Sequence, residues 1–151
     1  MKILNIKKLL LVLLCFPMIG FGQSKSILIS ENTFGGELDC KNEMKVNLST
    51  NDTSYFIFCS YQNREYKSII DLGSIYISNK EKLNSIISQL KKCISYMDDE
   101  TISYSVGQFK IYDFSKNLYI IDNSDYREKY THINKKAAVN WLKWLENCKV
   151  Y

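Results

Sequence analysis

The chain has 151 residues, and its 20 lysines and arginines exceed its 16 acidic residues to give a net charge of +4. Residues 1–22 hold three of the lysines and no acidic residue, so the remaining 129 residues carry a net charge of only +1. A nearly neutral domain lacks the basic surface that nucleic-acid binding requires, and we expect no nucleic-acid partner. The length of the remaining segment predicts one domain with its own core.

Residues 1–22 have the pattern of a secretory signal peptide. Lysines precede the apolar run 9–19, which is too short to span a bilayer as a helix and contains Pro17. A tripeptide of the small–x–small type ends at Gly22, as signal peptidase requires. We predict cleavage after Gly22 and a mature domain over residues 23–151.

Cys15 raises the alternative of a lipid-anchored protein. Leu14 stands directly before it, where a lipoprotein signal carries a small residue, so we expect Cys15 to be removed with the peptide. The abundance of Asn, Lys, Ile, Ser and Tyr is typical of an AT-rich bacterial genome. The sequence therefore predicts an exported bacterial protein, periplasmic or extracellular, whose mature chain has no transmembrane segment.

Strands are expected over the first part of the mature chain. Residues 44–48 alternate apolar and polar side chains, as a half-buried strand does, and residues 55–61 are aromatic and β-branched, as in a central strand. The expected order is a strand over 25–30, a loop over 31–43, strands over 44–48 and 55–61 joined by a turn, and strands over 66–72 and 75–77.

Two amphipathic helices are predicted. The first begins at Ser78, whose spacing to Glu81 is that of a capping box, and continues to Met97. Asn134 is expected to cap the second helix, which ends near Cys148. Apolar residues recur at steps of three and four along both helices, and those expected to be buried are Ile87, Leu90, Ile94, Trp141, Leu142 and Leu145. Ile57, in the strand expected over 55–61, is also expected to be buried.

A three-strand meander is predicted between the helices. Residues 101–106 alternate apolar and polar side chains, and strands over 109–114 and 118–122 follow after short turns. A polar link then leads to the second helix. The predicted fold is α+β, with an antiparallel sheet that is built from strand hairpins and this meander and is covered by the two helices.

The mature chain contains four cysteines, Cys40, Cys59, Cys93 and Cys148. In an exported protein they could form two disulfides in one of three connectivities, or stay reduced as small buried side chains. A hairpin through residues 49–54 would bring Cys40 beside Cys59, and two helices packed side by side would bring Cys93 beside Cys148. We predict these two bridges.

The sequence contains no clear catalytic or metal-binding pattern. His132 is the only histidine and there is no Cys-x-x-Cys motif, so no metal site and no cofactor are predicted. A cysteine nucleophile would need His132 as its base, yet no glycine-rich turn presents a cysteine. The acidic stretches 98–100 and 122–128 are interpreted as solvated turns. A small secreted hydrolase whose acidic residues meet only in the fold remains the alternative.

Tyrosine and arginine occur together in two polar stretches, 61–66 and 126–130. Both residue types are enriched in recognition surfaces, because they give contact area and hydrogen bonds at one point. A solvated surface is the alternative reading. The sequence favours a non-enzymatic module that binds a protein or a cell-envelope component, and the candidate binding residues are Tyr61, Arg64, Tyr66, Tyr126, Arg127 and Tyr130.

Overall fold

The computed structural model describes residues 24–65, 70–99, 102–112, 115–123 and 128–150. In these ranges the chain forms four strands and a helix, and then the same order again. The strands make two antiparallel sheets, with orders β1-β2-β3-β4 and β5-β6-β7-β8. The α+β class is therefore confirmed, but with two sheets instead of the one expected. The predicted signal peptide lies outside the described residues.

The first sheet is a meander of long strands. Its strands are β1 (Ser24–Phe34), β2 (Leu38–Asn47), β3 (Thr53–Gln62) and β4 (Leu72–Ile77). The loop predicted over 31–43 is wrong, because these residues form the end of β1 and the start of β2. Buried Leu38, Cys40 and Asn42 alternate there with exposed Asp39 and Lys41, so the charged residues are the outer face of a strand. Gly35 and Gly36, both with positive φ, make the turn between β1 and β2.

The second sheet is a meander of short strands. Its strands are β5 (Tyr104–Val106), β6 (Phe109–Ile111), β7 (Asn117–Asp122) and β8 (Lys129–Asn134). The predicted meander thus has a fourth strand, β8, in the segment read as a polar link. Thr131 and Ile133 are buried there while Tyr130 and His132 are half-buried, which is the alternation of a strand. The alternation is not visible in the sequence, because polar residue types occupy both faces of the strand.

Two helices, α2 (Lys80–Tyr96) and α3 (Lys135–Asn147), follow the two sheets. The cap of α2 is Asn79, whose side chain accepts from Lys82 N at 2.8 Å, so the prediction of Ser78 as the cap is wrong by one residue. Asn134 caps α3 as predicted, with Ala137 N as the donor at 2.9 Å. Within the described ranges no helix has the length and apolar character that a membrane span needs.

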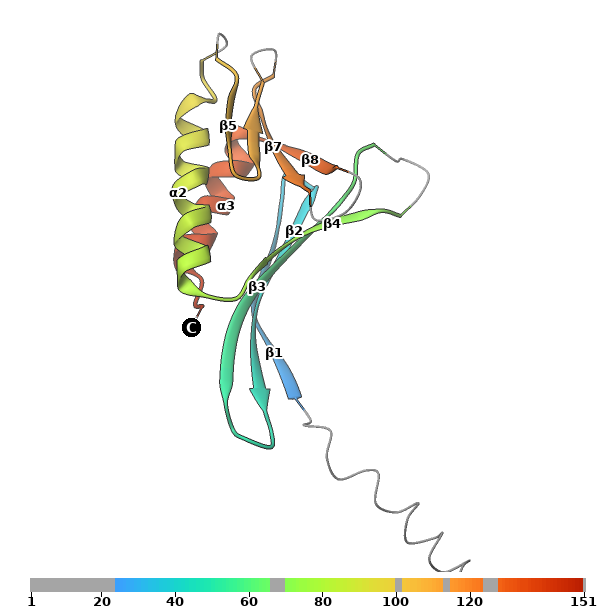
Figure 1. The fold of residues 1–151 in the computed structure, drawn as a ribbon, viewed down its shortest axis with the longest axis vertical. Helices are drawn as coiled ribbons and strands as arrows, with labels where there is room; N and C mark the ends of the chain where they lie inside the picture. The colour runs from blue at the N-terminus through green and yellow to red at the C-terminus, as the bar shows by residue number, and fades with distance from the viewer. Residues whose placement is uncertain (1–23, 66–69, 100–101, 113–114, 124–127, 151) are drawn as a thin grey trace, which may run out of the picture.

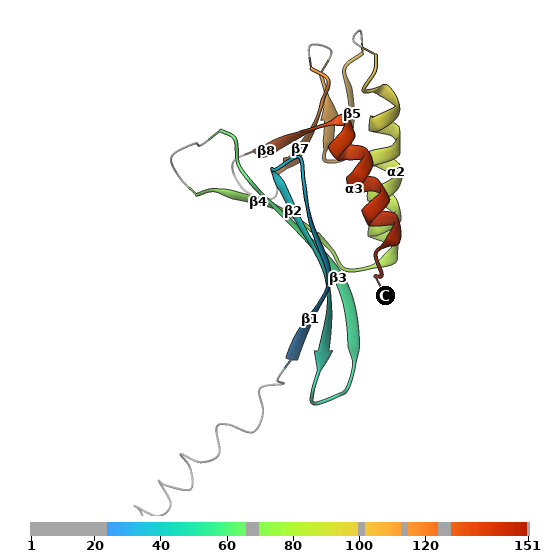
Figure 2. The same ribbon diagram turned by 180° about the vertical axis from the view of Figure 1, so that it is seen from behind.

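The helices lie side by side and run in opposite directions (Figures 1 and 2). Lys135, at the start of α3, forms an ion pair with Asp98 just after α2. Lys91 and Glu146 pair at 2.7 Å nearer the other end of α3. Two ion pairs therefore join the helices, and each is exposed and individually weak.

One core is shared by both sheets and both helices. The predictions of Ile57, Leu90, Trp141 and Leu145 as buried residues are confirmed. Ile87, Ile94 and Leu142 are half-buried at its margin instead, because the buried face of α2 is centred on Leu83, Ile86, Leu90 and Cys93. Trp141 is the largest fully buried side chain, and its ring meets Phe109 edge-on at a centroid distance of 5.9 Å.

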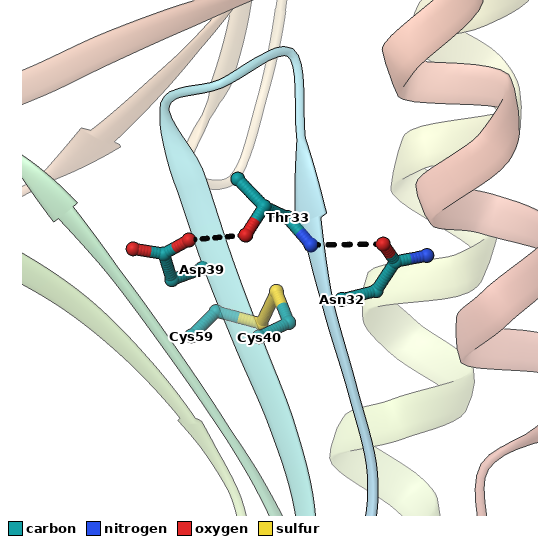
Figure 3. Close-up of a disulfide and its surroundings, with 5 residues drawn as sticks. All are labelled: Asn32, Thr33, Asp39, Cys40 and Cys59. Atoms are coloured by element: carbon teal, nitrogen blue, oxygen red, sulfur yellow. Dashed lines mark hydrogen bonds between the residues drawn. A yellow bond between two sulfur atoms is a disulfide. The ribbon is translucent and has the colours of Figure 1, made fainter.

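Cys40 and Cys59 form the predicted disulfide between β2 and β3 (Figure 3). The two residues are direct partners in the antiparallel ladder. Their Cα atoms are 4.0 Å apart, below the expected range of about 4.4–6.8 Å, because directly opposed residues in such a ladder approach closely. On the exposed face beside the bridge, Thr33 Oγ1 donates to Asp39 Oδ1 at 2.6 Å.

The predicted bridge between Cys93 and Cys148 is wrong, because both thiols are free. Cys93 lies near the C-terminal end of α2, and Cys148 caps the C-terminal end of α3. The Cys93 side chain is fully buried in the shared core, whereas Cys148 is only partly buried at its margin. Burial raises the pKa of the Cys148 thiol, and the nearby side chain of Asn42 on β2, which donates to Lys149 O at 3.3 Å, lowers it in part.

Candidate functional site

The two sheets are joined through Asn63, which follows β3 and is fully buried. Its Oδ1 accepts from Tyr130 N of β8 at 3.2 Å and its Nδ2 donates to Asp71 Oδ2 at 2.8 Å. Its backbone N–H donates to Asp71 O at 2.7 Å. One asparagine side chain therefore connects the end of β3, the start of β4 and the edge of β8.

Further bonds hold the same junction. Arg64 N donates to Tyr130 O at 3.0 Å, and the hydroxyl of Tyr61 donates to Lys129 O at 3.3 Å. Lys129 Nζ lies 3.0 Å from Asp71 Oδ1, and both of these side chains are mostly shielded from solvent. The backbone at this junction is therefore hydrogen-bonded to both sheets, and it fixes the positions of the side chains that it carries.

An open cleft of about 550 Å³ lies at this junction, and we call it the junction cleft. Its volume is within the range of about 300–1,000 Å³ that is usual for small-ligand pockets. The described residues that line it come from the β1–β2 turn, the end of β3 and the strands β7 and β8, and they are Glu37, Gln62, Asn63, Arg64, Tyr119, Tyr130 and His132.

Three rings form one wall of the junction cleft. Tyr119 and His132 are direct partners in the β7–β8 ladder, so they share one face of the sheet, opposite Leu118 and Ile133 in the core. The Tyr119 ring lies 5.2 Å from the imidazole of His132 and 6.3 Å from the ring of Tyr130, tilted by 36° in both cases. Tyr112 meets Tyr119 edge-on at 4.9 Å and supports it.

The opposite charges of Arg64 and Glu37 meet in the lining of the cleft. Arg64 Nη2 donates to Glu37 Oε1, and about a third of each side chain is exposed. Arg64 Nε and His132 Nδ1 are shielded and have no hydrogen-bond partner among the described residues. Burial, with a smaller contribution from the Arg64 charge, lowers the pKa of His132, and the Glu37 charge opposes this. The imidazole is therefore neutral at pH 7.

The sequence-based candidates are only partly brought together. Arg64 and Tyr130 both line the junction cleft. Tyr61 is only 2% exposed and belongs to the core beneath the junction, where burial and the charge of Asp122 raise its pKa. Tyr61 therefore packs beneath the cleft and stabilises the junction, and it is not available for contact with a ligand. The remaining candidates, Tyr66, Tyr126 and Arg127, lie outside the described residues.

Five lining residues were not among the sequence-based candidates. Gln62 and Asn63 lie within the polar stretch 61–66 that also contains the candidate Arg64. Their position beside Arg64 in the sequence could therefore have identified them. Glu37, Tyr119 and His132 come from a turn and two strands far from that stretch in sequence. Only the pairing of β7 with β8 and the junction with β3 bring them together, and no spacing along the chain encodes it.

The lining of the cleft offers stacking and hydrogen bonding. Its one carboxylate among the described residues, Glu37, is bound to Arg64. The free thiols of Cys93 and Cys148 lie elsewhere, and burial raises the pKa of Cys93 to about 11, so it is protonated and unreactive at neutral pH. No group of three His, Cys, Asp or Glu side chains in the described ranges is arranged to hold a metal ion.

Comparison of the chain with protein-family models, with curated proteins and with solved structures finds no significant match. No relative therefore assigns a role to the junction cleft. Its function has to be inferred from the side chains that line it.

Proposed function

We propose that this protein is an exported, non-enzymatic binding module that recognises a protein or a cell-envelope component through the junction cleft. The observation that carries the proposal is that the Tyr119–Tyr130–His132 ring wall and the Arg64–Glu37 pair line one open cleft. Rigid rings and an arginine at one point are the combination that recognition sites favour. The buried Asn63 network supports it, because preorganised side chains lose little entropy on binding.

The number and the partners of the polar groups in the cleft favour binding over hydrolysis. Glycoside hydrolysis uses two carboxyl groups flanking the scissile bond, and Glu37 is the one carboxylate among the described lining residues. A His-activated nucleophile needs a hydroxyl or thiol within hydrogen-bond reach of the imidazole, and His132 Nδ1 has no such partner in the described part of the chain. The secreted hydrolase remains the alternative, and turnover of a substrate would support it.

Export is part of the proposal. The Cys40–Cys59 disulfide is consistent with an oxidising compartment, where such bonds persist. Mass spectrometry of the protein from its native host should find a chain that starts at or near Gln23 without lipid. A mature chain that keeps residues 9–19, or one with a diacylglyceryl group on Cys15, would contradict export as a free protein.

The binding proposal is tested by cosedimentation of the purified mature chain with isolated envelope fractions of its host. The variants Arg64→Gln and Tyr119→Leu should reduce the bound fraction strongly, because each removes one side of the junction cleft. Lys91→Gln and Tyr96→Leu are matched controls, since they change an ion pair and a stacked tyrosine on α2. Equal loss in all four variants, or no binding by the unaltered chain, would contradict the proposal.

A further inference from the structure

The charge of the junction cleft indicates which class of ligand it accepts, if it is a binding site as proposed above. Arg64 and Glu37 carry opposite charges that cancel, and His132 is uncharged at neutral pH for the reasons given above. An anionic ligand would have to displace Glu37 from Arg64 and leave that carboxylate without its partner. The negative charges of the ligand and of Glu37 would also repel each other at this short range, so the cleft favours a ligand without net charge.

The ring wall favours a ligand with a flat apolar face. Tyr119 contacts both Tyr130 and His132, with a tilt of 36° to each ring, so the three rings form one aromatic cluster in the lining of the cleft. Aromatic rings bind apolar C–H surfaces by dispersion and by exclusion of water. A small ligand could place such a face on Tyr119, the ring that contacts both of the others.

The polar lining of the cleft favours ligand groups that donate and accept hydrogen bonds at the same time. Arg64 supplies only donors, Glu37 supplies only acceptors, and Gln62 beside them supplies both. A hydroxyl group can donate to the carboxylate and accept from the guanidinium without separating the ion pair. Arg64 Nε, which has no partner in the described part of the chain, adds hydrogen-bonding capacity that such a ligand could use after a small side-chain movement.

A sugar ring combines these properties, because it has a C–H face, a rim of hydroxyl groups and no charge. We propose that the junction cleft binds a neutral saccharide unit, with the C–H face of the sugar on Tyr119 and its hydroxyl groups on Arg64 and Glu37. The envelope component of the proposed function is then a glycan.

An extended peptide is less well matched to the same cleft. Peptides that add to a sheet use the free backbone groups of an edge strand, and β8 is an edge strand. At the cleft, however, Tyr130 N donates to Asn63 Oδ1 and Tyr130 O accepts from Arg64 N. These groups are already occupied, so a peptide cannot pair with β8 at this point.

The test is a titration of the mature chain, labelled with ¹⁵N, with chitotriose, maltotriose and trigalacturonic acid. At least one of the two neutral trisaccharides should shift the resonances of Arg64, Tyr119, Tyr130 and His132, and should bind more tightly than the anionic one. Sugar C–H protons should move upfield, because they would lie over the Tyr119 ring. Tighter binding of trigalacturonic acid would overturn the assignment of a neutral ligand.

Three variants locate the binding. Tyr119→Leu should weaken the neutral trisaccharide by about tenfold, a loss of roughly 1.4 kcal/mol, whereas Tyr119→Phe keeps the ring and should keep most of the affinity. Tyr96→Leu removes a tyrosine stacked on Tyr104 of β5 and should change nothing. If Tyr119→Leu fails to fold, the Glu37→Gln variant serves in its place. This substitution removes the partner of Arg64, and the folded variant should lose the upfield shifts of the sugar protons.

The outcomes separate this inference from the proposed function. Binding to envelope fractions without binding of either neutral trisaccharide would overturn the saccharide assignment and leave the binding module intact. If the chain binds neither the envelope fractions nor a neutral trisaccharide, the proposed function and the saccharide assignment are both overturned. Saccharide binding that Tyr119→Leu and Glu37→Gln leave unchanged would place the sugar outside the junction cleft and overturn the inference.

Discussion

The two halves of the molecule have the same element order and different proportions. Each is a four-stranded antiparallel meander followed by a helix. The strands have 11, 10, 10 and 6 residues in the first sheet but 3, 3, 6 and 6 in the second. The β2–β3 hairpin of the first sheet projects beyond the helices (Figure 1). Among the described residues, that half also exposes more large apolar side chains, which include Ile27, Leu28, Ile29, Leu48, Phe58, Leu72 and Tyr76.

The halves also differ in what stabilises them. A buried disulfide crosses the first sheet between Cys40 and Cys59. The short strands of the second sheet pack on the largest buried side chain of the described core, Trp141, which lies on α3. The same element order can therefore be stabilised by a covalent link or by a large apolar side chain, and the two halves need no sequence repeat to share it.

The largest effect is expected in the second half, from Trp141→Ala. The side chain is fully buried against Phe109, and its truncation leaves a cavity, so we expect unfolding to become easier by about 3–5 kcal/mol. Chemical denaturation measures the change. Trp144→Ala, on the same helix but half-buried beside Phe34, should cost less. A loss below about 1 kcal/mol for Trp141→Ala would mean that the second sheet does not depend on this side chain.

The disulfide should stabilise the first half by a smaller amount. Cys40 and Cys59 are 19 residues apart in sequence, so replacing both with alanine should lower the free energy of unfolding by about 3 kcal/mol. Amide protection against hydrogen exchange should fall most in β2 and β3. Cys93→Ala, which removes a buried but free thiol, is the matched control and should cost less. Equal loss of protection in β7 and β8 would show that the halves are not separately stabilised.

The fold was predictable wherever the sequence carried an unbroken period. The stripes of α2 and α3, the Asn134 cap and the hairpin behind the Cys40–Cys59 bridge are local patterns, and the structure has them. The missed strands contain buried Asn42 and Thr131 on their inner faces. Polar residues at core positions hide the alternation on which strand prediction depends.

The candidate site was predictable only in part. Arg64 and Tyr130 stand out as arginine and tyrosine in polar stretches, and both line the junction cleft. Their proximity depends on a buried asparagine, Asn63, that bonds to the edge of β8. Hydrogen bonds between two sheets, such as those of Asn63, leave no periodic pattern in the sequence, so the cleft itself could not be predicted from the sequence.

A moderate effect is expected at the contact between the halves, from Gly73→Ala. A Cβ at this position would lie 2.3 Å from ring atoms of Tyr61, which is buried and bonded through its hydroxyl to Lys129 O. The ring cannot move without breaking a bond between the sheets, so we expect a loss of about 1–3 kcal/mol. Ser74→Ala, next to it on the exposed face, should stay within about 0.5 kcal/mol. Equal losses of stability in the two variants would mean that the Tyr61 ring can shift to make room for the added methyl group without a cost.

The smallest effect concerns pH and His132, which belongs to the second half and faces the charges of Arg64 and Glu37 from the first. Its pKa lies below the ordinary value of 6.5, first through burial and then through Arg64, while Glu37 acts in the opposite direction. Between the two pKa values the unfolded chain binds more protons than the folded one, so stability falls as the pH drops through about 6.5. As the only histidine, it gives unambiguous ring C–H signals in a proton NMR titration.

Two substitutions should move this pKa in opposite directions. Arg64→Gln removes the nearby positive charge and leaves Glu37, so the pKa of His132 should rise, and the loss of stability on acidification should become smaller. Glu37→Gln removes the favourable negative charge, so the pKa should fall and the loss should become larger. Glu146→Gln removes a carboxylate from the ion pair between the helices and should leave the titration unchanged. Shifts of the same sign in the two cleft variants would mean that altered burial, and not the charges of the first half, controls His132, and the two halves would then be electrostatically independent at the junction cleft.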